Sequence, residues 1–82
     1  MAVYITRHAR NRMRLYEVTS EEVQEVLTAP EQVTPGAFGR QHAWKPRAQQ
    51  GWLRVTFKDE GARLVVITVT PTQALEGGHH AH

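Results

Sequence analysis

Residues 52–70 read WLRVTFKDEGARLVVITVT, and this stretch decides the fold. Apolar and polar side chains alternate over residues 52–57, and residues 64–70 are rich in β-branched side chains, so both segments are predicted to be strands. The sequence DEG at 59–61 suits a three-residue hairpin loop with Gly61 in the left-handed region. The stretch therefore predicts a β-hairpin.

The two faces of this hairpin differ in character. In the register set by a 59–61 loop, one face is apolar and consists of Leu53, Val55, Phe57, Val65, Ile67 and Val69. On the other face Arg54 lies opposite Val66 and one diagonal step from Thr68, so both polar side chains could reach one ligand. Because the apolar face is expected to pack on helices, Arg54 and Thr68 are predicted on the face away from them.

A strong helix signal lies upstream of the hairpin. Thr19-Ser20-Glu21-Glu22 is a capping box, in which the Thr19 hydroxyl accepts a hydrogen bond from the backbone N–H of Glu22. Pro30 is expected to end this helix at about Ala29, because the residue before a proline disfavours helical geometry.

A second helical pattern covers residues 7–16. His8 and Arg12 are four residues apart and therefore lie on one side of this helix. That side falls within the mostly apolar arc that includes Ala9 and Met13. We therefore expect His8 and Arg12 to point toward the body of the protein.

Shorter segments complete a single α+β domain. Residues 3–5, 32–34 and 38–45 have strand character, and residues 45–51 resemble a loop. The order β-α-α-β-β-β then predicts an α+β fold in which two N-terminal helices pack on one face of a small antiparallel sheet.

Length and composition limit the class of protein. A chain of 82 residues allows one small domain, predicted at residues 1–72, with a flexible tail at 73–82. The absence of cysteine excludes a disulfide scaffold, a thiolate metal site and a cysteine nucleophile. The longest apolar run is too short to cross a membrane, and no signal peptide is evident, so a cytoplasmic location is expected. We expect no cofactor and no metal, because the His-rich tail lacks a rigid fourth ligand.

The net charge of +2 hides a block pattern. Residues 1–16 contain four arginines and no acid, residues 17–31 contain five glutamates and no Lys or Arg, and residues 32–58 contain five basic residues and no acid. This pattern suits a molecule with a basic side for phosphate and an acidic side facing elsewhere, although ordinary solvated faces would give it too.

Chemistry at a phosphate without a metal requires cations, a group that exchanges protons near neutral pH, and donors for the developing charge. The chain offers arginines, histidines and threonines of these types: Arg12, Arg40, Arg54, His8, His42, Thr68 and Thr70. Two spacings bring members of this set together, His8 with Arg12 and Arg54 near Thr68.

These pairs also have structural interpretations. His8 could be a core histidine with satisfied hydrogen bonds, and Arg12 could lie along Tyr16. Arg54 and Thr68 could be ordinary strand residues. The pattern alone leaves both interpretations open.

Basic and aromatic side chains also interleave in a segment predicted to lie largely in a loop, a pattern that suits contact with RNA. The residues predicted to bind RNA are Arg40, His42, Trp44, Lys45 and Arg47. Trp44 and Trp52 could stack on bases, or they could cover the open face of the sheet, which we favour for Trp52.

The order of these features resembles the DUF4258 domain family over about residues 4–70. The similar segments are Thr6-Arg7-His8-Ala9 with Arg12-Met13 (an HA-x-x-R-M opening), residues 18–23 (VTSEEV), residues 27–30 (an L-x-x-P helix end) and the closing strands at 52–55 and 65–69. The family is grouped with the RelE/ParE-like toxins and, more broadly, with the fold shared by barnase-like, EndoU-like and colicin-type RNases.

The resemblance implies a compact α+β domain, a metal-independent ribonuclease mechanism and a neighbouring antitoxin or immunity protein as partner. By this resemblance His8 would transfer protons, Arg12 and Arg54 would hold the scissile phosphate, and Thr68 would donate to a nonbridging oxygen. Attack by the RNA 2′-OH would leave a 2′,3′-cyclic phosphate.

Two functional hypotheses follow. The first is a small toxin-like endoribonuclease that a partner neutralises. The second is a non-catalytic module that binds nucleic acid or protein through the same basic face, because function depends on the site and not on the fold. A housekeeping protein with another ligand is a third possibility.

Overall fold

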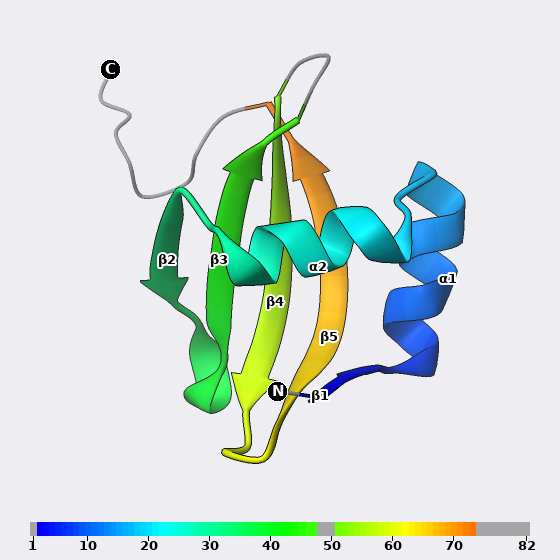
Figure 1. The fold of residues 1–82 in the computed structure, drawn as a ribbon. Helices are drawn as coiled ribbons and strands as arrows, with labels where there is room; N and C mark the ends of the chain where they lie inside the picture. The colour runs from blue at the N-terminus through cyan, green and yellow to red at the C-terminus, as the bar shows by residue number, and fades with distance from the viewer. Residues whose placement is uncertain (1, 48–50, 74–82) are drawn as a thin grey trace.

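The computed structural model describes residues 2–47 and 51–73. Its elements are, in chain order, β1 (Ala2–Ile5), α1 (Arg7–Tyr16), α2 (Ser20–Thr28), β2 (Gln32–Pro35), the 3-10 turn η1 (Ala37–Gly39), β3 (Gln41–Pro46), β4 (Trp52–Asp59) and β5 (Arg63–Thr72). The strands form one sheet in the order β1-β5-β4-β3-β2. Figure 1 shows α2 crossing the sheet and α1 lying beside β5.

The predicted α+β architecture is confirmed, with both helices packed on one sheet. The described residues form five strands, one more than the predicted order contained, and the sheet is mixed instead of antiparallel. The reason is that β1 pairs in parallel with β5, Ile5 lying opposite Val66, whereas the other neighbours are antiparallel.

Both helices begin at a threonine cap. The Thr19 hydroxyl accepts a hydrogen bond from the backbone N–H of Glu22 at 3.1 Å, which confirms the predicted cap of α2. Thr6 accepts from the backbone N–H of Ala9 at 3.1 Å and starts α1 directly after β1. Such caps satisfy backbone donors that have no partner inside the helix.

The core lies between the helices and the central strand β4. Its strand residues Leu53, Val55, Val66 and Val69 are fully buried, and the helices contribute Ala9, Met13, Val23 and Val26. Burial of one large aliphatic side chain contributes about 1.5–3 kcal/mol, so a domain of this size depends strongly on each of them.

The register of the β4–β5 hairpin differs from the predicted one. Gly61 has a φ of 86°, as expected, but β4 continues to Asp59 and β5 begins at Arg63, so the connection is 60–62 and Asp59 pairs with Leu64. A bulge at Thr56/Phe57 then shifts the pairing further. A bulge inserts a residue that the alternation pattern does not reveal.

This shift changes which residues share a face. Arg54 lies opposite Thr70 instead of Val66, and Thr68 lies opposite Thr56. The predicted apolar face was therefore wrong for Val65 and Ile67; Val66 joins the core and Leu64 packs against it.

The segment after β2 also departs from expectation. Residues 37–39 form a 3-10 turn in which Phe38 has a φ of 59°, and the strand begins at Gln41 and ends at Pro46. Residues 48–50 of the predicted loop, and the predicted tail from residue 74 on, lie outside the described residues.

Within residues 2–47 and 51–73, no helix is both long enough and apolar enough to cross a membrane.

Candidate functional site

The polar residues of interest gather on the side of the sheet that faces away from the helices, which we call the open face. Strand alternation and the observed pairings place the following side chains on it: Thr34, His42, Trp44, Arg54, Thr56, Thr68 and Thr70. Four different strands thus contribute to one surface, although the residues are up to 36 positions apart in the sequence (34 to 70).

His42 is held in place on β3 by two neighbours. Its Nδ1 lies 2.8 Å from Thr56 Oγ1, a hydrogen bond whose donor depends on the tautomer. Its ring meets the Trp44 ring edge to face, with centroids 6.3 Å apart. The imidazole is half-buried, so its orientation is restricted while it keeps contact with the surface.

Trp44 is buried beneath the other side chains of the open face. Only 1% of the residue is exposed, and its Nε1 donates to Thr34 Oγ1 at 2.9 Å. The guanidinium carbon of Arg54 lies 5.7 Å from the ring centroid, within cation–π range. Burial leaves Trp44 no room to stack on a base, so it orients its neighbours instead.

Arg54 occupies the central strand and is half-buried. Its Nη2 donates to Thr70 Oγ1 at 3.4 Å, and Thr68 lies on the same strand two residues earlier. A guanidinium in partly buried surroundings interacts with an anion more strongly than an exposed one, because water screens it less.

His8 and Arg12 do not point toward the body of the protein. Both are exposed on α1, whose buried residues are Ala9 and Met13 alone. The prediction failed because α1 lies at the edge of the sheet and buries only a narrow strip. Arg54, by contrast with these two residues, lies on the sheet: it reaches across to Thr70 on the neighbouring strand, so its side chain is directed along the open face.

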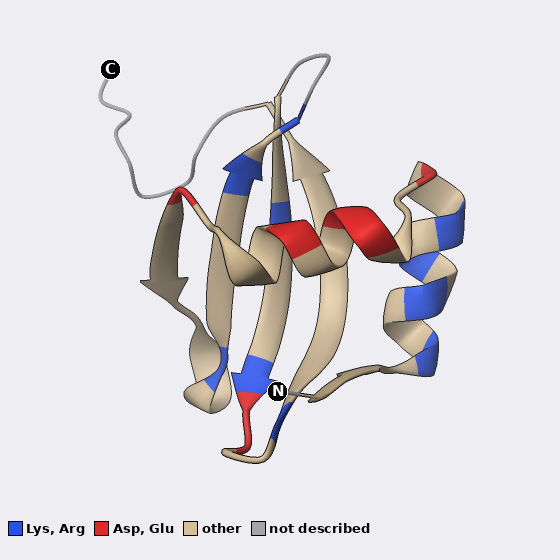
Figure 2. Ribbon diagram, in the orientation of Figure 1, with Lys and Arg blue, Asp and Glu red and all other residues tan. Residues whose placement is uncertain are grey.

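The basic block at residues 1–16 contains α1 and the acidic block at residues 17–31 contains α2, so the two helices carry charges of opposite sign. Figure 2 shows Lys and Arg along α1 and acids along α2. Because the helices are neighbours in the fold, the basic and acidic segments are not separated onto opposite sides of the molecule.

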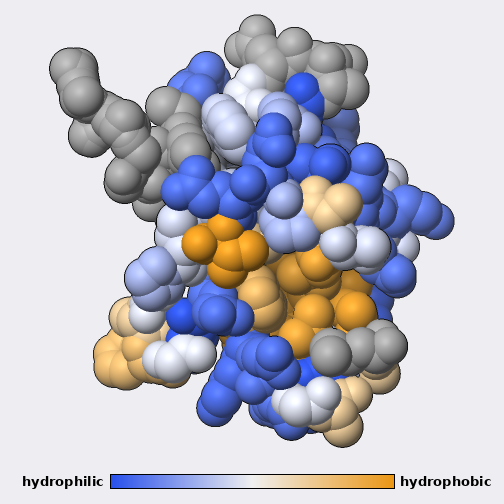
Figure 3. All heavy atoms as spheres, turned by 60° about the vertical axis from the view of Figure 1, so that its left-hand side comes forward, coloured by the Kyte–Doolittle hydropathy of each residue, from blue (hydrophilic) through white to orange (hydrophobic). Residues whose placement is uncertain are grey.

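A groove lies on the helix-bearing side, separate from the open face. It measures about 470 Å³ and its apolar lining consists of Val3, Leu27, Val33, Phe57 and Leu64. Figure 3 shows this apolar area, framed by hydrophilic residues.

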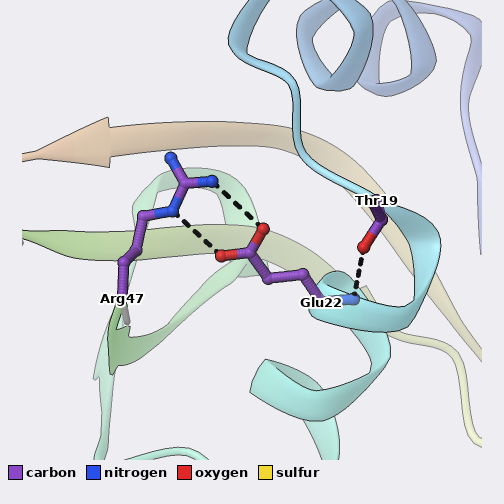
Figure 4. A network of polar contacts seen from close by, with 3 residues as sticks. All are labelled: Thr19, Glu22 and Arg47. Carbon is purple, nitrogen blue, oxygen red and sulfur yellow. Dashed lines mark hydrogen bonds and ion pairs between the residues drawn. The ribbon is translucent and has the colours of Figure 1, made fainter. Parts of the chain in front are cut away.

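Lys45 and Arg47 use their charges to hold α2. Lys45 Nζ donates to the carbonyl oxygen of Ala29, next to the C-terminal end of the helix, at 2.9 Å. Arg47 forms a bidentate ion pair with Glu22, at 2.9 and 3.1 Å, as Figure 4 shows. Both lie on the helix side of the sheet, so they are separated from His42 and Trp44, while Arg40 is exposed before β3.

Four of the five residues predicted to contact RNA are thus divided between two faces, and Arg40 precedes the strand. The cause is that most of this segment is strand β3, in which successive side chains point to opposite sides. Sequence reasoning also missed Thr56, although the alternation over 52–57 places it on the same face as Arg54.

The donor types on the open face favour anion binding over metal binding. In the part of the chain that the structure describes, no group of three or more His, Cys, Asp or Glu side chains could hold a metal ion. Arginine, histidine and threonine are the donors available, and they suit a phosphate.

Comparisons with known proteins give no match to this chain among protein-family models, curated proteins or solved structures. The resemblance to the DUF4258 family therefore stays a prediction.

The position of His42 depends on the absence of a side chain at Gly36, which yields a test. A Cβ there would lie 2.9 Å from His42 Nε2, whereas the φ of −120° is one that alanine adopts freely. We expect Gly36→Ala to displace the imidazole from Thr56 while changing stability by less than about 1 kcal/mol. NMR signals of the imidazole measure this displacement. Gly61→Ala, where no atom lies within 4 Å, should leave them unchanged; unchanged signals in Gly36→Ala would contradict the prediction.

Proposed function

We propose that this protein is a metal-independent endoribonuclease that binds RNA on the open face of its sheet. The observation that supports it best is the linked set Arg54–Trp44–His42–Thr56, which combines a phosphate-binding cation and a proton-exchanging group on one surface. Threonine hydroxyls on β5 add donors for the charge that develops on a phosphate oxygen.

In this proposal Arg54 holds the scissile phosphate and His42 accepts the proton of the 2′-OH. The 2′-oxygen bonds to phosphorus as the bond from phosphorus to the 5′-oxygen breaks, and water protonates the leaving oxygen. The products are a 2′,3′-cyclic phosphate and a free 5′-OH. His42 then returns its proton to solvent.

The test is cleavage of a labelled RNA in EDTA by purified protein. We expect cleavage that survives EDTA and ends in a 2′,3′-cyclic phosphate. We expect His42→Asn to lower its rate at least a hundredfold, within the range of about 10²–10⁴ for general acid–base catalysis. Arg54→Gln should also lower the rate at least a hundredfold, because the scissile phosphate loses its cation. Each variant must retain the wild-type circular dichroism spectrum.

His8→Asn serves as the matched control, because His8 is an exposed histidine on α1. If cleavage depends on His8 and not on His42, the catalytic centre lies at α1, as the DUF4258 resemblance implies. If the folded wild-type protein cleaves no member of a broad RNA panel, the endoribonuclease proposal fails.

A second candidate function is a non-catalytic module that binds a protein partner. The apolar groove favours it, because its lining includes Val33, which is 46% exposed, and because hydrophilic residues frame it. A contiguous exposed apolar patch with a polar rim often marks a protein contact. Val33→Ser would lower the affinity for such a partner and leave RNA cleavage unchanged.

A further inference from the structure

Helix α1 carries an unusual concentration of exposed positive charge. Arg7, Arg10, Arg12 and Arg14 are all exposed, and the helix contains no acidic residue. Arg7, Arg10 and Arg14 follow the spacing i, i+3, i+7, so they form one row along the helix, which we call the α1 row. The row is about 10 Å long from the helical rise of 1.5 Å per residue.

The α1 row has no acidic partner among the described residues. In residues 2–47 and 51–73, none of its arginines forms an ion pair, in contrast to Arg47 and Arg63, which pair with Glu22 and Glu60. The side-chain hydrogen bond of the row runs from Arg14 Nη1 to Asn11 Oδ1, at 3.4 Å, and it leaves the charge uncompensated.

This arrangement opposes the stability of the helix. Like charges three and four residues apart repel, and Arg7 stands in the first turn, where the helix dipole favours an acid; only Arg14, in the last turn, has a favourable place in the dipole. Helix α2 shows the opposite choice, with Glu21 and Glu22 in its first turn. A polyanion bound along α1 would remove the repulsion.

A nucleic acid fits α1 better than a membrane surface does. A helix that lies in a bilayer interface needs an exposed apolar face, but Ala9 and Met13 are buried in the core of this protein. The exposed apolar side chains of α1, Leu15 and Tyr16, lie at its last turn. A straight row of cations instead matches the regular charges of a phosphate backbone.

The position of α1 is fixed by strand β5. The helix lies against β5 near the edge of the sheet, and Thr68 and Thr70 of the same strand lie on the open face, away from the helix (Figure 1). Thr6 fixes the start of the helix to this strand, because its backbone N–H donates to the Val66 carbonyl at 3.2 Å and its hydroxyl to that of Ile67 at 3.3 Å.

From these observations we propose that the α1 row binds the phosphate backbone of single-stranded RNA. The inference rests on the proposed RNA function and adds a binding surface to it. The row positions the strand without regard to base identity, because phosphate contacts carry no sequence information.

The test compares two variants that lose the same charge. Arg10→Gln/Arg14→Gln removes two charges from the row, and Lys58→Gln/Arg63→Gln removes two exposed charges elsewhere. The probe is a fluorescein-labelled oligo-2′-deoxyuridine of about 20 nucleotides, which lacks the 2′-OH and cannot be cleaved. Binding is followed by anisotropy over a salt range of about 50 to 200 mM, in which phosphate contacts change affinity strongly.

We expect the row variant to bind at least fivefold more weakly at about 100 mM salt. Its slope of log K against log salt should fall by roughly 1.4, since each contact to a single-stranded phosphate contributes about 0.7. The Lys58/Arg63 variant should stay within twofold of wild type. Equal losses in the two variants, or no loss in either, overturn the inference.

Two further results separate the inference from the proposed function. If wild-type protein cleaves RNA and the row variant binds the probe normally, the assignment of the α1 row as an RNA-binding surface is wrong and the nuclease proposal stands. If the row variant loses binding to phosphatidylserine vesicles and not to the probe, the row is a membrane contact and the inference is overturned. Absence of any binding to the probe by wild-type protein also overturns it.

Discussion

Replacement of Leu53 by alanine should lower the free energy of unfolding by about 3 kcal/mol, within the range of about 2–5 kcal/mol for buried leucines. Leu53 has no exposed surface and lies on β4, the central strand of the sheet. Removal of its side chain loses apolar burial and leaves a cavity that the paired strands on either side of β4 cannot easily fill. For a domain of this size the loss amounts to a large fraction of the total stability.

Urea unfolding followed by circular dichroism measures this effect. The urea concentration at the midpoint should fall, and the dependence of the free energy of unfolding on urea concentration should stay the same. Leu15→Ala is the matched control, because Leu15 is 64% exposed on α1 and the substitution removes the same atoms. We expect it to change stability by no more than about 0.5 kcal/mol. Similar losses for Leu53→Ala and Leu15→Ala would show that the core is not where the structure places it.

Gly51→Ala should destabilise the protein by about 2–3 kcal/mol, for two reasons that act together. Gly51 has a φ of 75°, in the left-handed region that disfavours a Cβ. In addition, a Cβ there would lie 2.6 Å from the carbonyl oxygen of Thr72, an atom of the backbone that moves only with the end of β5.

Gly39 separates the two causes. It has the same φ of 75°, but a Cβ added there would meet no atom within 4 Å. Gly39→Ala should therefore cost only the conformational part, about 1 kcal/mol. The difference appears as a melting temperature lower by at least about 4 °C in Gly51→Ala, given about 4–8 °C per kcal/mol for small domains. Equal melting temperatures would disprove the close approach to Thr72.

Local signals in the sequence predicted local structure well. The capping box placed the start of α2 correctly because the hydrogen bond from Glu22 to Thr19 spans only three residues. The left-handed Gly61 was also found, since its conformation is decided within the loop. The exact loop, 60–62, was missed because the Asp59 carboxylate accepts from the Gly61 N–H while Asp59 itself stays in β4.

The alternation of apolar and polar residues could not predict how strands that are distant in the sequence pair with one another. The different register at the hairpin connection and the bulge at Thr56/Phe57 together moved the partner of Arg54 from Val66 to Thr70, and nothing in the alternation indicates either change. The contact between His42 and Thr56 depends on the register of β3 against β4, which two separate strands determine together. For His8 and Arg12, periodicity gave the side of the helix but not how wide a strip of α1 the sheet would cover.

Strand β3 also determines how α2 can move. Lys45 holds the last turn of the helix through the Ala29 carbonyl, and Arg47 holds its first turn through Glu22. Lys45 lies near the end of β3 and Arg47 directly follows the strand, so sliding α2 along its axis or opening it from either end would break one of these contacts. Helix and strand therefore form a single unit of local unfolding, coupled more closely than their separation along the chain suggests.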